Sequence, residues 1–121
     1  LIPSGPPHDP DRRHLFVVAT DACADADHLL IGISTIRPGI YHDPACVLAA
    51  GSHPFITAPS YVEYRYARRD SARHIGNCVD RGLFVLREPL EAGALRLICD
   101  GVEVTAHISR GLRSYYRRVC S

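Results

Sequence analysis

The strongest indication of the fold in this sequence is the segment HLFVVATDACADADHLLIGIS, residues 14–34. It contains two apolar runs, HLFVVAT (14–20) and HLLIGIS (28–34), and each has the length of a buried strand. Between them lies the short polar segment DACADAD. Two strand-length runs joined by a short polar turn are typical of a hairpin, so we expect the two strands to pair in the antiparallel sense.

Three further segments downstream have the pattern of strands. CVLAAG (46–51) and GLFVLRE (82–88) are short apolar runs, whereas SYVEYRYA (60–67) alternates with a period of two. That alternation places two groups of side chains on opposite faces of one strand: Tyr61, Glu63, Arg65 and Ala67 on one, and Val62, Tyr64 and Tyr66 on the other.

The last third of the chain changes to a helical pattern. In EPLEAGALRLICDG (88–101), a proline in the first turn, acidic residues near the start and Gly101 at the end are helix start and stop signals. A second helix is expected over 108–119, with arginines along one side. Strands followed by helices predict a mainly β protein: a small, bent antiparallel barrel packed by two C-terminal helices.

Length and composition predict one domain over residues 1–121, with the barrel in 1–88 and the helical part in 89–121. The hydrophobic fraction of 46% and charged fraction of 22% are those of an ordinary globular protein. A net charge of +1 does not by itself indicate a nucleic-acid partner. All 14 cationic residues are arginine, which either favours phosphate binding or reflects a coding bias.

Cysteine usage and hydropathy predict a cytoplasmic protein. The five cysteines are an odd number without a CxxC pair, which favours buried free thiols over a disulfide framework or a zinc ribbon. No apolar run approaches the ~20 residues of a membrane span, and the first residues lack the apolar region of a signal peptide. We therefore expect no membrane association. Because the sequence does not begin with methionine, we also expect residues before Leu1.

The polar stretch GIYHDPACVLAAGSHPFI (39–56) allows three interpretations. Its four chemically active side chains are His42, Asp43, Cys46 and His53. In the first, the stretch is a structured connection in which Cys46 enters the core and Asp43 shapes a turn. In the second, the histidines exchange protons at a catalytic site. In the third, His42, Cys46 and His53 bind zinc. The zinc interpretation ranks last because the spacing matches no usual motif, so we expect no metal and no cofactor.

Three segments resemble the MazF/PemK-like family of plasmid-maintenance and growth-inhibiting toxins. DRRHLFVVATD (11–21) resembles the arginine-led first strand of that family, and LLIGISTIRPG (29–39) resembles its strand ending in threonine. APSYVEYRYARRDSARHIG (58–76) resembles the serine-led strand that follows. The similarity is one of pattern and order over roughly residues 1–76.

This resemblance implies an SH3-like barrel and a metal-independent endoribonuclease toxin of a type II toxin–antitoxin system. Its expected partners are single-stranded RNA, a cognate antitoxin protein and a second copy of the chain in a homodimer. Carried over by position, Arg13, or Arg12 beside it, stabilises the phosphorane of RNA cleavage. Thr35 or Ser34 lies near the scissile phosphate.

The residue types extend this candidate site. RNA cleavage by the 2′-hydroxyl needs a base, an acid and donors for the developing charge, and the histidines His14, His42 and His53 are the candidates for proton transfer. The candidate RNA contacts are Arg37, Tyr64 and Arg65, because cations interleaved with aromatic rings are typical of single-strand binders. Tyrosines at alternate positions also suit core packing. The alternative function is a non-catalytic barrel that binds nucleic acid or a protein partner.

Overall fold

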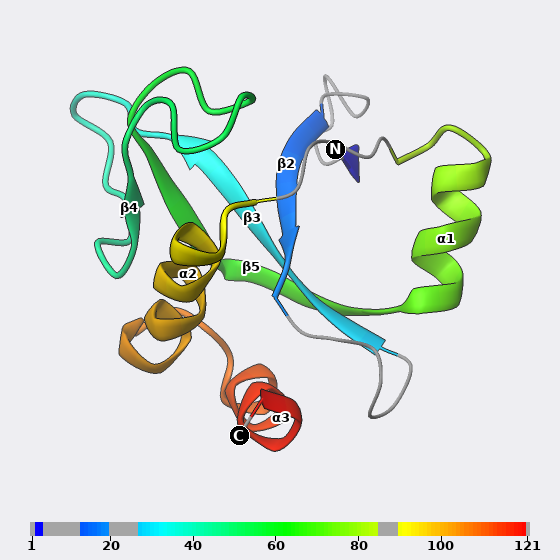
Figure 1. Ribbon diagram of the computed structural model, residues 1–121. Coiled ribbons are helices and arrows are strands. Elements are labelled where there is room, and N and C mark those ends of the chain that lie inside the picture. The colour runs from blue at the N-terminus through cyan, green and yellow to red at the C-terminus, as the bar shows by residue number, and fades with distance from the viewer. Residues whose placement is uncertain (1, 4–12, 20–26, 85–89, 121) are drawn as a thin grey trace.

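A computed structural model describes residues 2–3, 13–19, 27–84 and 90–120 (Figure 1). The strands are β1 (Ile2–Pro3), β2 (Arg13–Val18), β3 (Asp27–Thr35), β4 (Val47–Leu48) and β5 (Ser60–Ser71). The helices are α1 (Ala72–Asp80), α2 (Ala92–Val104) and α3 (Arg110–Cys120). None of the described helices is long and apolar enough to cross a membrane.

The strands form one antiparallel sheet in the order β1-β2-β3-β5-β4. The predicted hairpin of β2 and β3 is confirmed, with Leu15 opposite Ile33 and Val18 opposite Leu30. The strand expected over 46–51 is reduced to β4, which pairs two residues with the start of β5.

A shift in register bends the sheet between β3 and β5. Leu30 lies opposite Arg68, whereas Gly32 lies opposite Glu63, so residues 64–67 of β5 face Ile31 alone. Extra residues on one strand bend that strand and increase its twist. Figure 1 shows β5 as a long strand curving from the side of β4 towards α1. The result is a curled antiparallel sheet accompanied by the expected C-terminal helices.

The fold is mixed rather than mainly β, because α1 adds a helix that the sequence patterns did not predict. In the described residues the helices account for about as much of the chain as the strands. The Ser71 hydroxyl accepts a hydrogen bond from the backbone N–H of His74 at 3.0 Å and so caps the start of α1. The helix is followed by a turn at Gly82, whose φ is 73°. Residues 82–84 of the strand expected over 82–88 lie in this turn, and 85–88 fall outside the described residues.

Loss of the Ser71 cap is expected to destabilise the protein. Ser71→Ala leaves one N–H of the first helical turn without its partner, which lowers the free energy of unfolding by about 1 kcal/mol. Urea denaturation followed by circular dichroism measures the change. Ser114→Ala, at an exposed position inside α3, is the matched control and should not lower stability. Equal unfolding midpoints for wild type and Ser71→Ala would contradict the assignment of Ser71 as a cap.

The hydrophobic core joins the sheet to the C-terminal helices. Its buried residues form one cluster that includes β2, β3, β5, α2 and α3. Tyr64 is fully buried at the centre of β5, and its hydroxyl donates a hydrogen bond to the Ile98 carbonyl of α2 at 2.6 Å. Figure 1 shows α2 and α3 together on one side of the sheet, with α1 at the other end of β5.

Two residues of α2 differ from the helical pattern expected from the sequence. Gly101, expected as the stop signal, lies inside the helix and is buried against Tyr64. A Cβ at this position would overlap the Tyr64 hydroxyl oxygen, so only glycine lets the strand and the helix approach this closely. Leu97, which its helical spacing from Leu90 and Ala94 predicts on the apolar side, is instead 56% exposed, while Ile98 beside it is buried.

Candidate functional site

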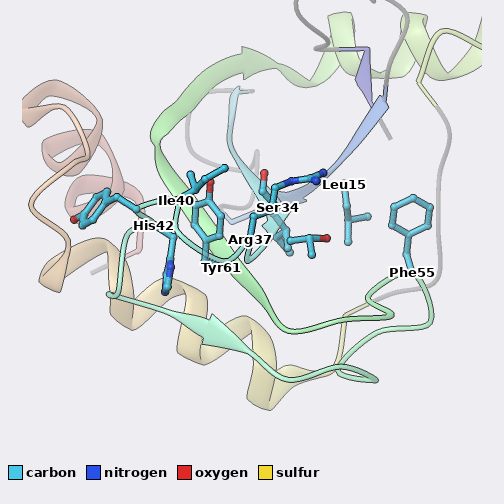
Figure 2. A pocket seen from close by; sticks show the side chains of 10 residues that line it. Leu15, Ser34, Arg37, Ile40, His42, Phe55 and Tyr61 are labelled. Atoms are coloured by element: carbon cyan, nitrogen blue, oxygen red, sulfur yellow. The ribbon is translucent and has the colours of Figure 1, made fainter.

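A pocket of about 440 Å³ opens where β3 ends. Its floor includes Leu15 and Ile33, which are paired across β2 and β3 and belong to the core cluster. The view in Figure 2 shows Leu15 and Phe55 at one end, His42 and Ile40 at the other, and polar side chains between them. The complete lining is Leu15, Ile33, Ser34, Thr35, Arg37, Ile40, Tyr41, His42, Phe55 and Tyr61.

The chain direction after β3 explains how neighbouring residues line one pocket. Thr35 is the last residue of β3, and the Ile36 N–H is still held by the Pro59 carbonyl at 3.0 Å. The chain then turns back at Gly39, which has a φ of 75° that suits glycine. Residues before and after this turn therefore line the same pocket.

The loop that carries His42 is fixed by the C-terminal part of the protein. Asp43 is buried, and its carboxylate accepts a hydrogen bond from the Thr105 hydroxyl at 2.5 Å and another from the Ala45 N–H at 2.9 Å. On the other side of His42, the Tyr41 hydroxyl lies 2.8 Å from the His107 ring nitrogen Nε2. Anchors on both sides hold His42 in place beside the pocket.

Glu63 organises the polar side of the pocket. The Ser34 hydroxyl donates to one carboxylate oxygen of Glu63 at 2.8 Å, and the Tyr61 hydroxyl donates to the other at 3.2 Å. Burial, together with the nearby Glu63 carboxylate, raises the pKa of Tyr61, so its hydroxyl keeps the proton and remains a donor at neutral pH.

The imidazole of His42 lies beside the ring of Tyr61. Its ring centroid is 5.4 Å from that of Tyr61. His42, Tyr61 and Glu63 also line a smaller adjoining hollow of about 130 Å³. A carboxylate and an imidazole, next to a guanidinium and the hydroxyls of Ser34, Thr35 and Tyr61, are the functional groups of a general acid–base site that acts on an anionic substrate.

The pocket gathers four of the residues that the sequence pointed to: Ser34, Thr35, Arg37 and His42. Thr35 and Arg37 are exposed at its mouth, and Ser34 is half-buried. Arg13 and His14 are the first two residues of β2, and the structure describes only their backbone. Arg12 lies outside the described residues.

The other candidates lie elsewhere. His53 is buried, and its Nδ1 accepts the Phe55 N–H at 3.0 Å, as expected for a histidine that stabilises a loop. The proposal that Tyr64 stacks on RNA is corrected by its complete burial, which leaves no ring face for a base. Arg65 is exposed, with its guanidinium carbon 5.5 Å from the centroid of the Tyr66 ring, and it borders the smaller hollow.

The thiols in the described part of the chain fit the prediction of buried free cysteines. Cys46 and Cys78 are buried and free, and Cys99 is half-buried and free. Burial raises the pKa of the Cys46 thiol, which keeps it protonated and unreactive. Across residues 2–3, 13–19, 27–84 and 90–120, no group of three or more histidine, cysteine, aspartate or glutamate side chains is placed to hold a metal ion.

Glu63 is the central residue that the sequence reasoning missed. The alternation in residues 60–67 places Glu63 on the same face as Tyr61, and a carboxylate in the middle of a tyrosine-rich strand is itself a signal. Phe55 and Tyr41 were missed for a different reason: they lie in loops, where no periodic pattern indicates which way a side chain points.

Comparison with known protein families, with curated proteins and with solved structures finds no match. The proposal of a function therefore rests on the pocket and on the sequence resemblance.

Proposed function

We propose that the protein is a metal-independent endoribonuclease that cleaves single-stranded RNA in the pocket at the end of β3. The observation that carries this proposal is the gathering of a guanidinium, an imidazole, the hydroxyls of Ser34, Thr35 and Tyr61, and a neighbouring carboxylate around one pocket. RNA cleavage through the 2′-hydroxyl requires these functional groups. They come from β3, β5 and the loop between Thr35 and Cys46.

In this proposal each polar group has a separate task. Glu63 accepts the proton of the 2′-hydroxyl, and His42, in its protonated form, donates a proton to the leaving 5′-oxygen. Arg37 and the Thr35 hydroxyl stabilise the charge that develops on the phosphorane. The Ser34 and Tyr61 hydroxyls hold the Glu63 carboxylate in position through the two hydrogen bonds described above.

The biological setting of the proposal comes from the MazF/PemK-like resemblance over residues 1–76. From this resemblance we also propose that the curled sheet closes into an SH3-like barrel and that the protein is a cytoplasmic homodimer with a cognate antitoxin. The bend between β3 and β5 supports the barrel, because a small barrel needs a strongly bent strand. The exposed arginine-bearing side of α3, which includes Arg110 and Arg118, offers a surface for an acidic antitoxin segment.

The test is incubation of the purified protein with a long single-stranded RNA in EDTA, followed by mapping of the cut ends. Discrete cuts with 2′,3′-cyclic phosphate ends are expected from the wild type. Arg37→Ala should slow cleavage by about 10²-fold or more, as loss of a charge-stabilising donor does. Arg96→Ala, which removes an exposed arginine of α2 away from the pocket, is the matched control and should cleave at the wild-type rate.

Binding without catalysis is the second candidate, and the rim of the pocket favours it. Ile40 is 63% exposed and Tyr41 is 72% exposed, so two large apolar side chains stand at the mouth. A binding module would retain RNA in a filter or gel-shift assay and leave it intact. Intact RNA from folded protein that still binds would therefore replace the nuclease proposal with this one.

A further inference from the structure

A second group of chemically active side chains lies at the junction of β5 and α1, outside the pocket. His74 and Cys78 are four residues apart in α1, which places them on one side of the helix, and Asp70 lies in β5 just before the helix begins. His74 Nδ1 lies 2.9 Å from both carboxylate oxygens of Asp70. His74 Nε2 lies 3.4 Å from the Cys78 sulfur. Both ring nitrogens are thus engaged, one by a carboxylate and one by a thiol.

These two contacts indicate which ring nitrogen carries the hydrogen when the imidazole of His74 is neutral. The carboxylate of Asp70 accepts, so Nδ1 carries the hydrogen and Nε2 is left as an acceptor facing the Cys78 thiol. A nucleophile within reach of a base, with the base oriented by a third group, is the arrangement that activates cysteine in enzymes. The ring of Phe84 meets the His74 ring edge-on, with 6.0 Å between the ring centroids.

Burial restricts what can reach the sulfur. Cys78 is 7% exposed, so a bulky electrophile has no path to it, whereas the His74 side chain is 57% exposed. Cys46 is buried to the same degree, at 6% exposed, but its hydrogen-bond partner is the Tyr64 hydroxyl and not an imidazole. The two cysteines therefore form a natural comparison in which burial is equal and the base is present at one only.

We propose that Cys78 is an oxidation site for small hydroperoxides, with His74 as its base and Asp70 as the residue that positions His74. In the reaction, His74 Nε2 takes the thiol proton while the sulfur attacks one oxygen of hydrogen peroxide. The O–O bond breaks, a sulfur–oxygen bond forms, and the leaving oxygen takes the proton from His74 and departs as water. The thiol is oxidised to a sulfenic acid and the peroxide is reduced to water.

The test is peptide-resolved detection of the sulfenic acid that forms on the folded full chain. The folded protein is exposed to hydrogen peroxide for a series of times, catalase removes the excess, and the protein is then unfolded in urea with dimedone, so that the trap reaches every sulfenic acid. After digestion, label is quantified at Cys78 and at Cys46 by mass spectrometry. Cleavage after Arg73 and Arg81 releases Cys78 in a peptide without another cysteine. Cys78 is expected to be labelled at least about tenfold faster than Cys46. This factor is smaller than the rate enhancement that a positioned general base usually gives. Labelling of Cys78 no faster than Cys46 would overturn the proposal.

Variants at two positions, His74 and Asp70, separate proton transfer from packing. His74→Ala should reduce the Cys78 rate to that of Cys46, and free imidazole added to this variant should restore part of it. Loss without restoration by imidazole would show that His74 only packs there, which rejects its role as a base. Asp70→Asn should slow labelling while Asp70→Glu retains it, because the positioning role needs a carboxylate. Equal rates in Asp70→Asn and wild type would remove Asp70 from the site.

Discussion

Glu63→Gln is expected to slow RNA cleavage by about 10²–10⁴-fold, the usual contribution of a positioned general base. Glutamine keeps the size of the side chain and can still accept the Ser34 hydrogen bond, but it cannot take the proton of a 2′-hydroxyl. Initial cleavage rates of a short fluorescent RNA measure the effect, and circular dichroism shows whether the variant keeps the wild-type fold.

The control for this variant is Glu103→Gln. Glu103 is exposed on α2 and pairs with Arg117, away from the pocket, so its change to glutamine should leave the cleavage rate unaltered. His42→Asn, which removes the proposed general acid, should also slow cleavage. A wild-type cleavage rate in Glu63→Gln would assign Glu63 a structural role and reject it as the base.

Gly101→Ala is expected to lower the free energy of unfolding by about 1–3 kcal/mol, the usual cost of overpacking a core. The added methyl group would overlap the Tyr64 hydroxyl oxygen and lie 2.8 Å from the ring carbon that bears it. Because Tyr64 is fully buried and bonded to the Ile98 carbonyl, the helix and the strand must move apart. Urea denaturation followed by fluorescence or circular dichroism measures the loss.

Two other helical glycines make this prediction sharp. Gly93 in α2 and Gly111 in α3 have no neighbouring atom within 4 Å of the position that a Cβ would take, so alanine there meets open space. Alanine is the better helix former by up to about 1 kcal/mol, and both control variants should therefore be at least as stable as wild type. Destabilisation of all three variants by the same amount would show that the contact with Tyr64 has no special importance.

Local patterns in the sequence predicted most of the regular structure. The apolar runs on either side of DACADAD predicted the hairpin of β2 and β3, and the alternation after Pro59 predicted β5. Both C-terminal helices were predicted from their period and end signals. Helix α1 was missed because its cap, Ser71, directly follows the last residues of a strand pattern, so the change of period there is not visible.

The candidate site was predicted in part. Ser34, Thr35 and Arg37 are close in sequence, and the end of a predicted strand followed by a Pro-Gly turn already places them together. Glu63 joins them only because β3 pairs with β5 in a register that sets Gly32 opposite it. That register depends on the interruption at Ile31, which no local pattern reports.

Most strands, two helices and several turns can be predicted from local sequence, because they depend on side-chain period and on neighbouring residues. The contacts between distant segments cannot: Asp43 with Thr105 beside His42, Tyr64 against Gly101, and Glu63 with Ser34. These contacts depend on strand register and on the packing of α2 against β5. Both are set by the fit of the whole core, so they emerge only when the chain is folded.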